Sequence, residues 1–311
     1  MRSLVNTRNI KWVCHHLHID KSKTICPATL DKSLKHMQEK WHIMKEIKEN
    51  YTRDSLYRRM FITVDELYNQ NCKKMRTFID VDTTIGLEGI DTALKVKRYW
   101  KEHGVDLQIG TQPLEGLSTP ANIELFEKAC SMVDFVGCLP SRDKHPEEHL
   151  DIVFSTAEKE GKTVEAHLDQ CNIPTEKETE LFCDYVEKYK YYSRARAVHC
   201  ISLSCHPLEY QHEIAERMSV YNIGAIICPS AAISMTQHRE LSAPIHNSIG
   251  PVRVFLNKGV DVGLGVDNIE DIFMPFCDGD LSFELRLLAE ATRIYDPEKL
   301  IKIASNNMGF D

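Results

Sequence analysis

Near its start the chain reads Trp12-Val13-Cys14-His15-His16-Leu17-His18-Ile19-Asp20, an apolar run that ends in polar side chains. Seven further apolar runs follow along the 311 residues, and polar segments with helical patterns separate them. The predicted strands span residues 12–20, 75–82, 107–113, 135–140, 164–169, 195–200, 223–229 and 262–267. Eight strands that alternate with helices are typical of a (β/α)8 TIM barrel. We therefore predict the α/β class and a single domain over residues 1–311.

Helical patterns are clearest over residues 90–103, 121–130 and 147–160, and residues 32–70 are long enough for two helices. A doubly wound open sheet is the alternative, but it usually carries a glycine-rich phosphate turn after its first strand. Here the first strand runs into histidines. The nearest glycine pattern, Gly263-Leu264-Gly265, lacks the third glycine. The barrel is the better prediction.

Composition and charge limit the partners. The chain is 42% hydrophobic and 27% charged, and its formal net charge is −8. Because it also has no basic stripe, the sequence argues against nucleic acid or a membrane surface as partner. Residues 1–11 contain no apolar signal-peptide core, and the longest apolar stretch, 223–233, is too short to span a bilayer. The eleven cysteines include no C-x-x-C pair. We expect reduced thiols and a cytoplasmic protein.

Five polar side chains fall at the carboxyl ends of predicted strands. Side chains alternate along a strand, so His16 and His18 should both point into the barrel mouth, roughly 6–7 Å apart along the strand. His167 ends the fifth strand, His199 the sixth and Asp267 the eighth. Barrel enzymes place their chemistry at this face. Because buried imidazoles and carboxylates need partners, one shared cation would satisfy all five groups.

A second histidine pattern is less convincing. His145-Pro146-Glu147-Glu148-His149 fits the H-x-x-E-H string of one class of metalloproteases. Pro146 is typical of the first turn of a helix, which places His145 at or before the cap. The two imidazoles would then not share a helical face, so we predict an ordinary helix start.

The chain resembles the amidohydrolase superfamily, in particular its branch of cytosine deaminase and N-isopropylammelide isopropylaminohydrolase. The resemblance covers nearly the whole sequence. It is carried by residues 16–22 (HLHIDKS), 76–82 (RTFIDVD) and 265–271 (GVDNIED), the last continuing to 275–280 (PFCDGD). It implies a metal-dependent hydrolase that attacks a C–N bond of a small cyclic amidine or amide, as a deaminase or deamidase.

The resemblance also implies roles for the strand-end residues. The ligands of one divalent ion, zinc or iron, would be His16, His18, His167 and Asp267. The metal would lower the pKa of a water towards ~7. Asp267 would take the proton of this water and pass it to the leaving amine, and His199 would position the attacking oxygen. A plain third imidazole ligand is the alternative for His199.

Three departures from the family bear on the substrate. Cytosine deaminase has a proton-shuttling glutamate where this chain has Gln170, whose amide cannot exchange a proton near neutral pH. The glutamine that reads the pyrimidine edge is replaced by Leu114, and the histidine usual on the second strand by Phe78. We therefore predict a small heterocyclic substrate other than cytosine. Asn268 and Asp169, two residues beyond His167, are further substrate-binding candidates.

The family's small flanking β-sandwich has no counterpart in this sequence, so either the sandwich has been lost or the chain is a fragment, and we expect a barrel without it. The apolar surface that the sandwich covers in relatives would then be bare, which favours a homo-oligomer. The competing hypothesis is a barrel that binds metal or a ligand without turnover, since Gln170 and the missing flanks are features of a decayed enzyme. Retention of all the predicted metal ligands favours the enzyme.

Overall fold

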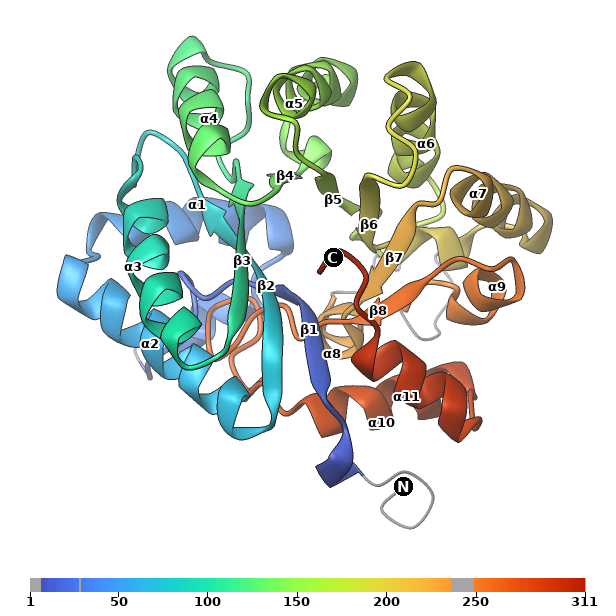
Figure 1. Cartoon of the computed structure of the whole chain (residues 1–311). Helices are drawn as coiled ribbons and strands as arrows, with labels where there is room; N and C mark the ends of the chain where they lie inside the picture. Colours follow the sequence, from blue (N-terminus) through green and yellow to red (C-terminus); the bar gives the residue numbers. More distant parts are fainter. Residues whose placement is uncertain (1–6, 28, 236–248, 311) are drawn as a thin grey trace.

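The computed structural model describes residues 7–27, 29–235 and 249–310. Its strands are β1 (Trp12–Leu17), β2 (Cys72–Asp80), β3 (Asp106–Gln112), β4 (Val136–Cys138), β5 (Val164–Leu168), β6 (Ala195–His199), β7 (Gly224–Ile227) and β8 (Val262–Leu264). All neighbouring strands pair in parallel, in the orders β1-β2-β3 and β4-β5-β6-β7-β8. Single parallel bridges, Leu17 with Asp267 and Gly110 with Phe135, join the two sheets at both edges. The predicted (β/α)8 barrel is confirmed (Figure 1).

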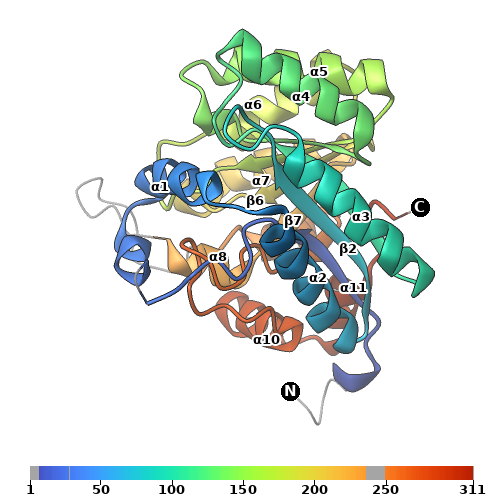
Figure 2. The same ribbon diagram turned by 90° about the vertical axis from the view of Figure 1, so that its left-hand side faces the viewer.

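Helices surround the strands in the order that the sequence predicts. They are α1 (Met37–Glu49), α2 (Arg53–Asn69), α3 (Glu88–Glu102), α4 (Pro120–Met132), α5 (Pro146–Glu160), α6 (Glu178–Lys188), α7 (Leu208–Val220), α8 (Pro229–Ser234), α9 (Val252–Asn257), α10 (Leu281–Thr292) and α11 (Pro297–Ser305), with 3-10 turns at Thr7–Asn9, Leu30–Leu34, Pro140–Arg142 and Ser202–Cys205. The segment 32–70 holds two helices, as expected. Of these, α2 joins the ring, whereas α1 lies with α8 on the side away from the C-terminus (Figure 2). None of the described helices is long and apolar enough to cross a bilayer.

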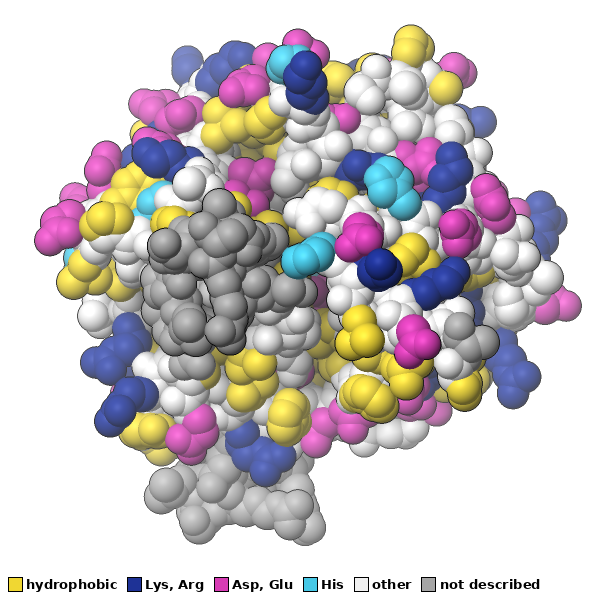
Figure 3. Space-filling model, turned by 180° about the vertical axis from the view of Figure 1, so that it is seen from behind, with side chains coloured by type: hydrophobic (Ala, Val, Ile, Leu, Met, Phe, Trp, Pro, Cys, Tyr) yellow, Lys and Arg dark blue, Asp and Glu magenta, His cyan; other side chains and the backbone are white. Residues whose placement is uncertain are grey.

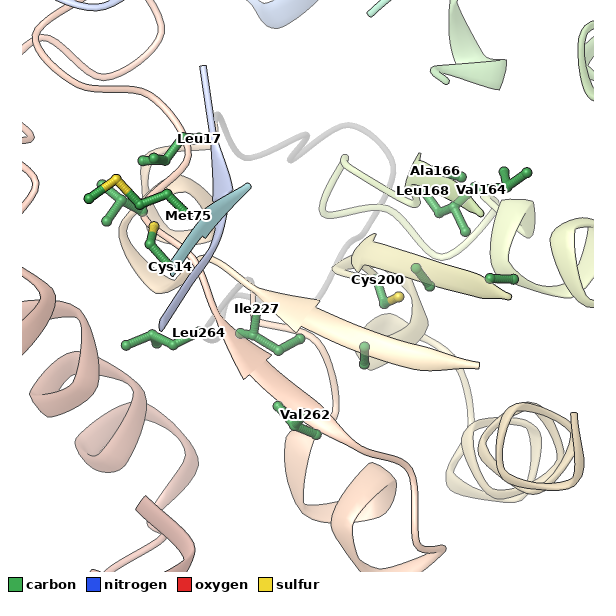
Figure 4. Close-up of a cluster of buried hydrophobic side chains, with 14 of the residues drawn as sticks. Cys14, Leu17, Met75, Val164, Ala166, Leu168, Cys200, Ile227, Val262 and Leu264 are labelled. Carbon is green, nitrogen blue, oxygen red and sulfur yellow. The ribbon is translucent and has the colours of Figure 1, made fainter. Parts of the chain in front are cut away.

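The core lies between the strands and the helices. Alternation along β5 explains how one strand serves both sides: Val164, Ala166 and Leu168 belong to the buried apolar cluster, while Glu165 and His167 contact polar groups inside the barrel. Figure 4 shows side chains of this cluster on several strands. Every strand is buried along most of its length, which is why the sequence shows apolar runs rather than polar–apolar alternation.

The two ends of the barrel interior differ. At the amino end, the carboxylate of Glu165 forms ion pairs with Arg76 (2.6 Å) and Arg196 (2.9 Å), and Arg76 also donates to the backbone oxygen of Gly309 (2.8 Å). The ring of Phe310 lies under the Arg76 guanidinium, 5.7 Å away. Gly309 and Phe310 thus cover this end, where the buried charges of Glu165, Arg76 and Arg196 are paired.

An irregularity in β1 sets the direction of its histidines. The register with β2 shifts between Cys14 and Leu17, which is the signature of a β-bulge. His15 lies towards the amino end, with its ring centre 5.9 Å from that of Phe310. His16 and His18 lie together at the other end, with ring centres 4.9 Å apart. The bulge therefore lets consecutive histidines both enter the barrel.

Candidate metal centre

Four imidazoles and one carboxylate converge at the carboxyl ends of β1, β5, β6 and β8. Nε2 of His16 and Nε2 of His18 lie 3.3 Å and 3.2 Å from Oδ1 of Asp267, and Nε2 of His199 lies 3.8 Å from its Oδ2. Nε2 of His167 is 3.3 Å from Nε2 of His18. The ligand atoms of two subsets, His16 with His18 and His167, and His16 with His199 and Asp267, lie within 4.8 Å of one another. All five residues are buried.

The backbone reaches this arrangement through uncommon conformations. His199, the last residue of β6, has φ +74°, and Asp267, shortly after β8, has φ +75°. The backbone of a residue other than glycine is strained in this left-handed region, and such strain is concentrated at functional sites. Gly265 gives the histidines room, because a Cβ there would lie 2.7 Å from the Cβ of His16.

Burial sets the protonation states. It lowers the pKa of His16 and His18, lowers that of His167 far below its usual range, and lowers that of His199 to about 4. Burial alone would raise the pKa of Asp267, but contacts with His16 and His18 outweigh it and hold this pKa well below the usual range. The centre therefore offers neutral imidazole nitrogens and an ionised carboxylate at neutral pH.

This set of donors fits a divalent metal ion. Neutral nitrogen and carboxylate oxygen ligands suit zinc and iron. Both ring nitrogens of His16 and Nδ1 of His199 are buried without a hydrogen bond, an arrangement that is costly without a further partner. Nδ1 of His167 lies 3.2 Å from the backbone oxygen of Cys138. A hydrogen bond there fixes the tautomer so that Nε2 faces the centre as a ligand.

Phe78 forms an apolar wall of the centre. Its ring centre lies 4.7 Å from that of His16 and 4.6 Å from that of His167, both in edge-to-face geometry. The phenylalanine thus holds the imidazole planes and supplies no ligand atom. The departure from the family's histidine at this position leaves the other ligands intact.

A pocket of about 770 Å³, part of it open to solvent, lies above the centre. Of the predicted site residues it is lined by His18, His167, Asp267, Gln170, Leu114 and Asn268. One wall comes from the start of α1, including Lys40 and Trp41, and the opposite wall from α8 and the segment around Phe273. The sequence did not predict that α1 folds over the mouth.

Two glutamines present unpaired amide atoms to the pocket. Nε2 of Gln170 and Oε1 of Gln112 are buried without a hydrogen bond, and both residues line the pocket. Gln112 is the last residue of β3. We did not predict it as a site residue, although it ends a strand as His167 and His199 do, and this position was the signal that could have found it.

Leu114 and Asn268 have additional structural roles. Leu114 is buried in a small cluster with Trp41 and Met44 of α1, so an apolar residue here holds α1 against the barrel. The Asn268 amide donates to the carboxylate of Asp271. Asn268 therefore faces the pocket from a fixed position.

The structure does not bring Asp169 into the pocket. Its φ of +52° ends the strand geometry, so the alternation that we used to place it beside His167 does not apply. Its carboxylate accepts from the backbone N–H of Glu178 (2.8 Å) and from Oγ1 of Thr179 (2.5 Å). Asp169 fixes the start of α6, and its prediction as a substrate-binding residue is corrected.

The second histidine pattern is a helix start, as predicted. His145 is the N-cap of α5 and Pro146 its first residue. His149 is buried, and its Nδ1 lies 2.6 Å from Oδ2 of Asp143. The motif is therefore a structural pair outside the metal centre.

No known family model matches the chain, but individual proteins do. It is 31% identical over 245 residues, 77% of this chain and 88% of the relative, to an uncharacterised protein of Haemophilus influenzae. It is 22% identical over 284 residues, 86% of this chain, to N-isopropylammelide isopropyl amidohydrolase of Pseudomonas sp. strain ADP, of which it spans 64%. These relatives agree with the resemblance to the amidohydrolase superfamily that the sequence shows.

Solved structures share the fold of this chain. The 5-methylcytosine deaminase of Klebsiella pneumoniae superposes with a TM-score of 0.88 over 96% of this chain and 73% of that chain, at 22% identity. N-isopropylammelide isopropylaminohydrolase of Burkholderia multivorans gives a TM-score of 0.79 at 18% identity over 97% and 75%. A zinc complex of the atrazine chlorohydrolase of Arthrobacter aurescens gives 0.64 at 12% identity over 95% and 69%. The named relatives include hydrolases that act on C–N bonds.

Proposed function

We propose that the chain is a metal-dependent amidohydrolase that releases ammonia or an amine from a small nitrogen heterocycle. The observation that carries the proposal is the convergence of four neutral imidazoles on one ionised carboxylate at the floor of a pocket. His16, His18, His167 and Asp267 would hold one divalent ion, zinc or iron. A zinc complex of a structural neighbour supports zinc. Such an ion supplies Lewis-acid activation of water.

The remaining steps belong to side chains of this protein. Asp267 is ionised and takes the proton of the attacking water, then delivers it to the leaving nitrogen. His199 faces Oδ2 of Asp267. Its imidazole is neutral near pH 7 and hydrogen-bonds the attacking oxygen. Gln170 donates a hydrogen bond but cannot carry a proton.

The two unpaired glutamine atoms define the edge of the substrate. Nε2 of Gln170 is a donor and Oε1 of Gln112 is an acceptor, so together they match a ring edge with a carbonyl oxygen and an N–H group. Leu114 stands where cytosine deaminase has a glutamine that hydrogen-bonds the pyrimidine, so this wall of the pocket is apolar. A cyclic amide presents such an edge, and so does cytosine at O2 and N1–H, so the expectation against cytosine rests on Gln170 and Leu114.

Other partners follow from charge. The face shown in Figure 3 carries acidic and basic side chains intermixed rather than a basic patch. With the net charge of −8, this supports a small-molecule partner and neither nucleic acid nor a membrane surface. A homo-oligomer and a cytoplasmic location stay predictions.

The test is a turnover screen of the metal-loaded protein. Protein reconstituted with Zn²⁺ or Fe²⁺ is incubated with a panel of cyclic amides, amidines and aminotriazines, and released ammonia or alkylamine is measured. Turnover that disappears in His199→Ala and Asp267→Asn supports the proposal. Ligands that bind the metal-loaded protein without any turnover across the panel would instead support a non-catalytic binding barrel.

A further inference from the structure

Lys40 lines the pocket, and no counterion for it lies among the described residues. It lies on α1, in the wall that faces the metal centre, and only 9% of the residue is exposed. Its ammonium group makes no hydrogen bond and no ion pair with any residue of 7–27, 29–235 or 249–310. The same wall carries Lys35, His36 and Gln38 beside the apolar Met37 and Trp41.

Other buried lysines of the same region are paired. Nζ of Lys21 lies 2.6 Å from Oδ1 of Asp80, and Nζ of Lys48 lies 3.2 Å from Oδ2 of the same carboxylate. The fold thus neutralises buried ammonium groups where their role is structural. Lys40 differs from Lys21 and Lys48 because no carboxylate of the described residues contacts its ammonium group.

Asp271 is the acidic residue whose charge reaches Lys40, and it is already occupied. Its oxygens accept from the amide of Asn268 and from the backbone N–H groups of Phe273 (2.8 Å) and Met274 (3.0 Å). Burial lowers the pKa of Lys40, and the charge of Asp271 only opposes this in part. The described residues therefore leave the Lys40 ammonium without a neutralising carboxylate in contact with it.

The pocket offers none of its own. Asp267 is the only carboxylate among the described residues that line it, and it faces the imidazoles. Lys35, at the rim, is exposed and pairs with Glu39 (3.4 Å). Among the described residues none supplies the Lys40 ammonium with a negative charge, and an incoming ligand can.

We propose that Lys40 is a specificity-determining residue that binds a carboxylate substituent of the heterocyclic substrate. The heterocyclic ring in this inference comes from the proposed function, whereas the carboxylate is inferred from the pocket alone. One unpaired ammonium matches a single negative charge, which favours a carboxylate over a doubly charged phosphate.

Binding to the zinc-loaded protein tests this. Calorimetry compares uracil with its 5- and 6-carboxylates, which add one anionic group to the same ring at different positions. We expect at least one carboxylate to bind about tenfold or more tightly than uracil. Lys40→Met should remove that advantage and change the affinity for uracil less than about twofold, whereas Lys40→Arg should keep most of it.

The matched control is Lys45→Met, because Lys45 lies on the same helix, is half exposed and contacts Glu115. It should leave all three affinities unchanged. A carboxylate advantage that survives in Lys40→Met would mean that the anion binds the metal, and this overturns the proposal. So does the absence of any carboxylate-dependent gain, including a failure of all three ligands to bind. Because no turnover is needed, a negative hydrolysis screen with this binding pattern intact would contradict the proposed function alone.

Discussion

Replacing Asp267 by asparagine separates chemistry from binding. The amide keeps the shape of the side chain but removes the negative charge that faces His16 and His18 at 3.3 Å and 3.2 Å and the proton acceptor that faces His199 at 3.8 Å. We expect kcat to fall at least ~10²-fold, the lower end for a positioned acid–base group, which corresponds to about 2.7 kcal/mol in the barrier. KM should change much less, because the pocket walls are untouched.

The assay is steady-state amine release at saturating metal, with the metal content of each variant measured alongside. Asp169→Asn is the control, since this carboxylate is also buried but binds Glu178 and Thr179 at the start of α6. It should lower the melting temperature and leave kcat close to that of the unmodified protein. Near-normal turnover of Asp267→Asn with metal bound would refute the reasoning.

Three further outcomes are expected. Asp80→Asn should destabilise the fold by roughly 3–5 kcal/mol in denaturant unfolding, because it leaves Lys21 without its closest carboxylate; a loss below 1 kcal/mol would show that the network is dispensable. Burial raises the pKa of Glu284 to about 7, so the ionised carboxylate destabilises the folded state above pH 7, and this cost fades as the pH falls towards the pKa of the unfolded chain. Glu284→Gln should therefore increase the free energy of unfolding by about 2 kcal/mol more at pH 8 than at pH 5. Equal effects of the substitution at both pH values would contradict this. Cytosine should be a very poor substrate, and Gln170→Glu combined with Leu114→Gln should raise ammonia release from it; ordinary enzyme rates in the unmodified protein would show that both positions are misread.

The sequence predicted the barrel and the clustering of polar side chains at its strand ends for one physical reason. Parallel strands covered on both faces are apolar along their length, so a polar residue at a strand end stands out against them. His167 and His199 were found in this way, and so was Asp267 near the end of β8. The strands and helices of the structure match the predicted ranges within a few residues.

What the sequence did not predict depends on local backbone turns. Asp169 was placed by alternation, but the chain leaves strand geometry at that residue. The position of α1 over the mouth was missed because its apolar pattern does not tell which surface it covers. Trp41 and Leu114 form that contact only in the folded chain, and with it Lys40 enters the pocket.

The metal content of purified protein tests the central claim most directly. After reconstitution and removal of free metal, elemental analysis should find close to one zinc or iron per chain. His16→Ala and His167→Ala should each lower this occupancy sharply, whereas His149→Ala, which removes a buried imidazole paired with Asp143 outside the centre, should not. No bound metal in the unmodified protein, or full occupancy in both His16→Ala and His167→Ala, would contradict the assignment of the centre.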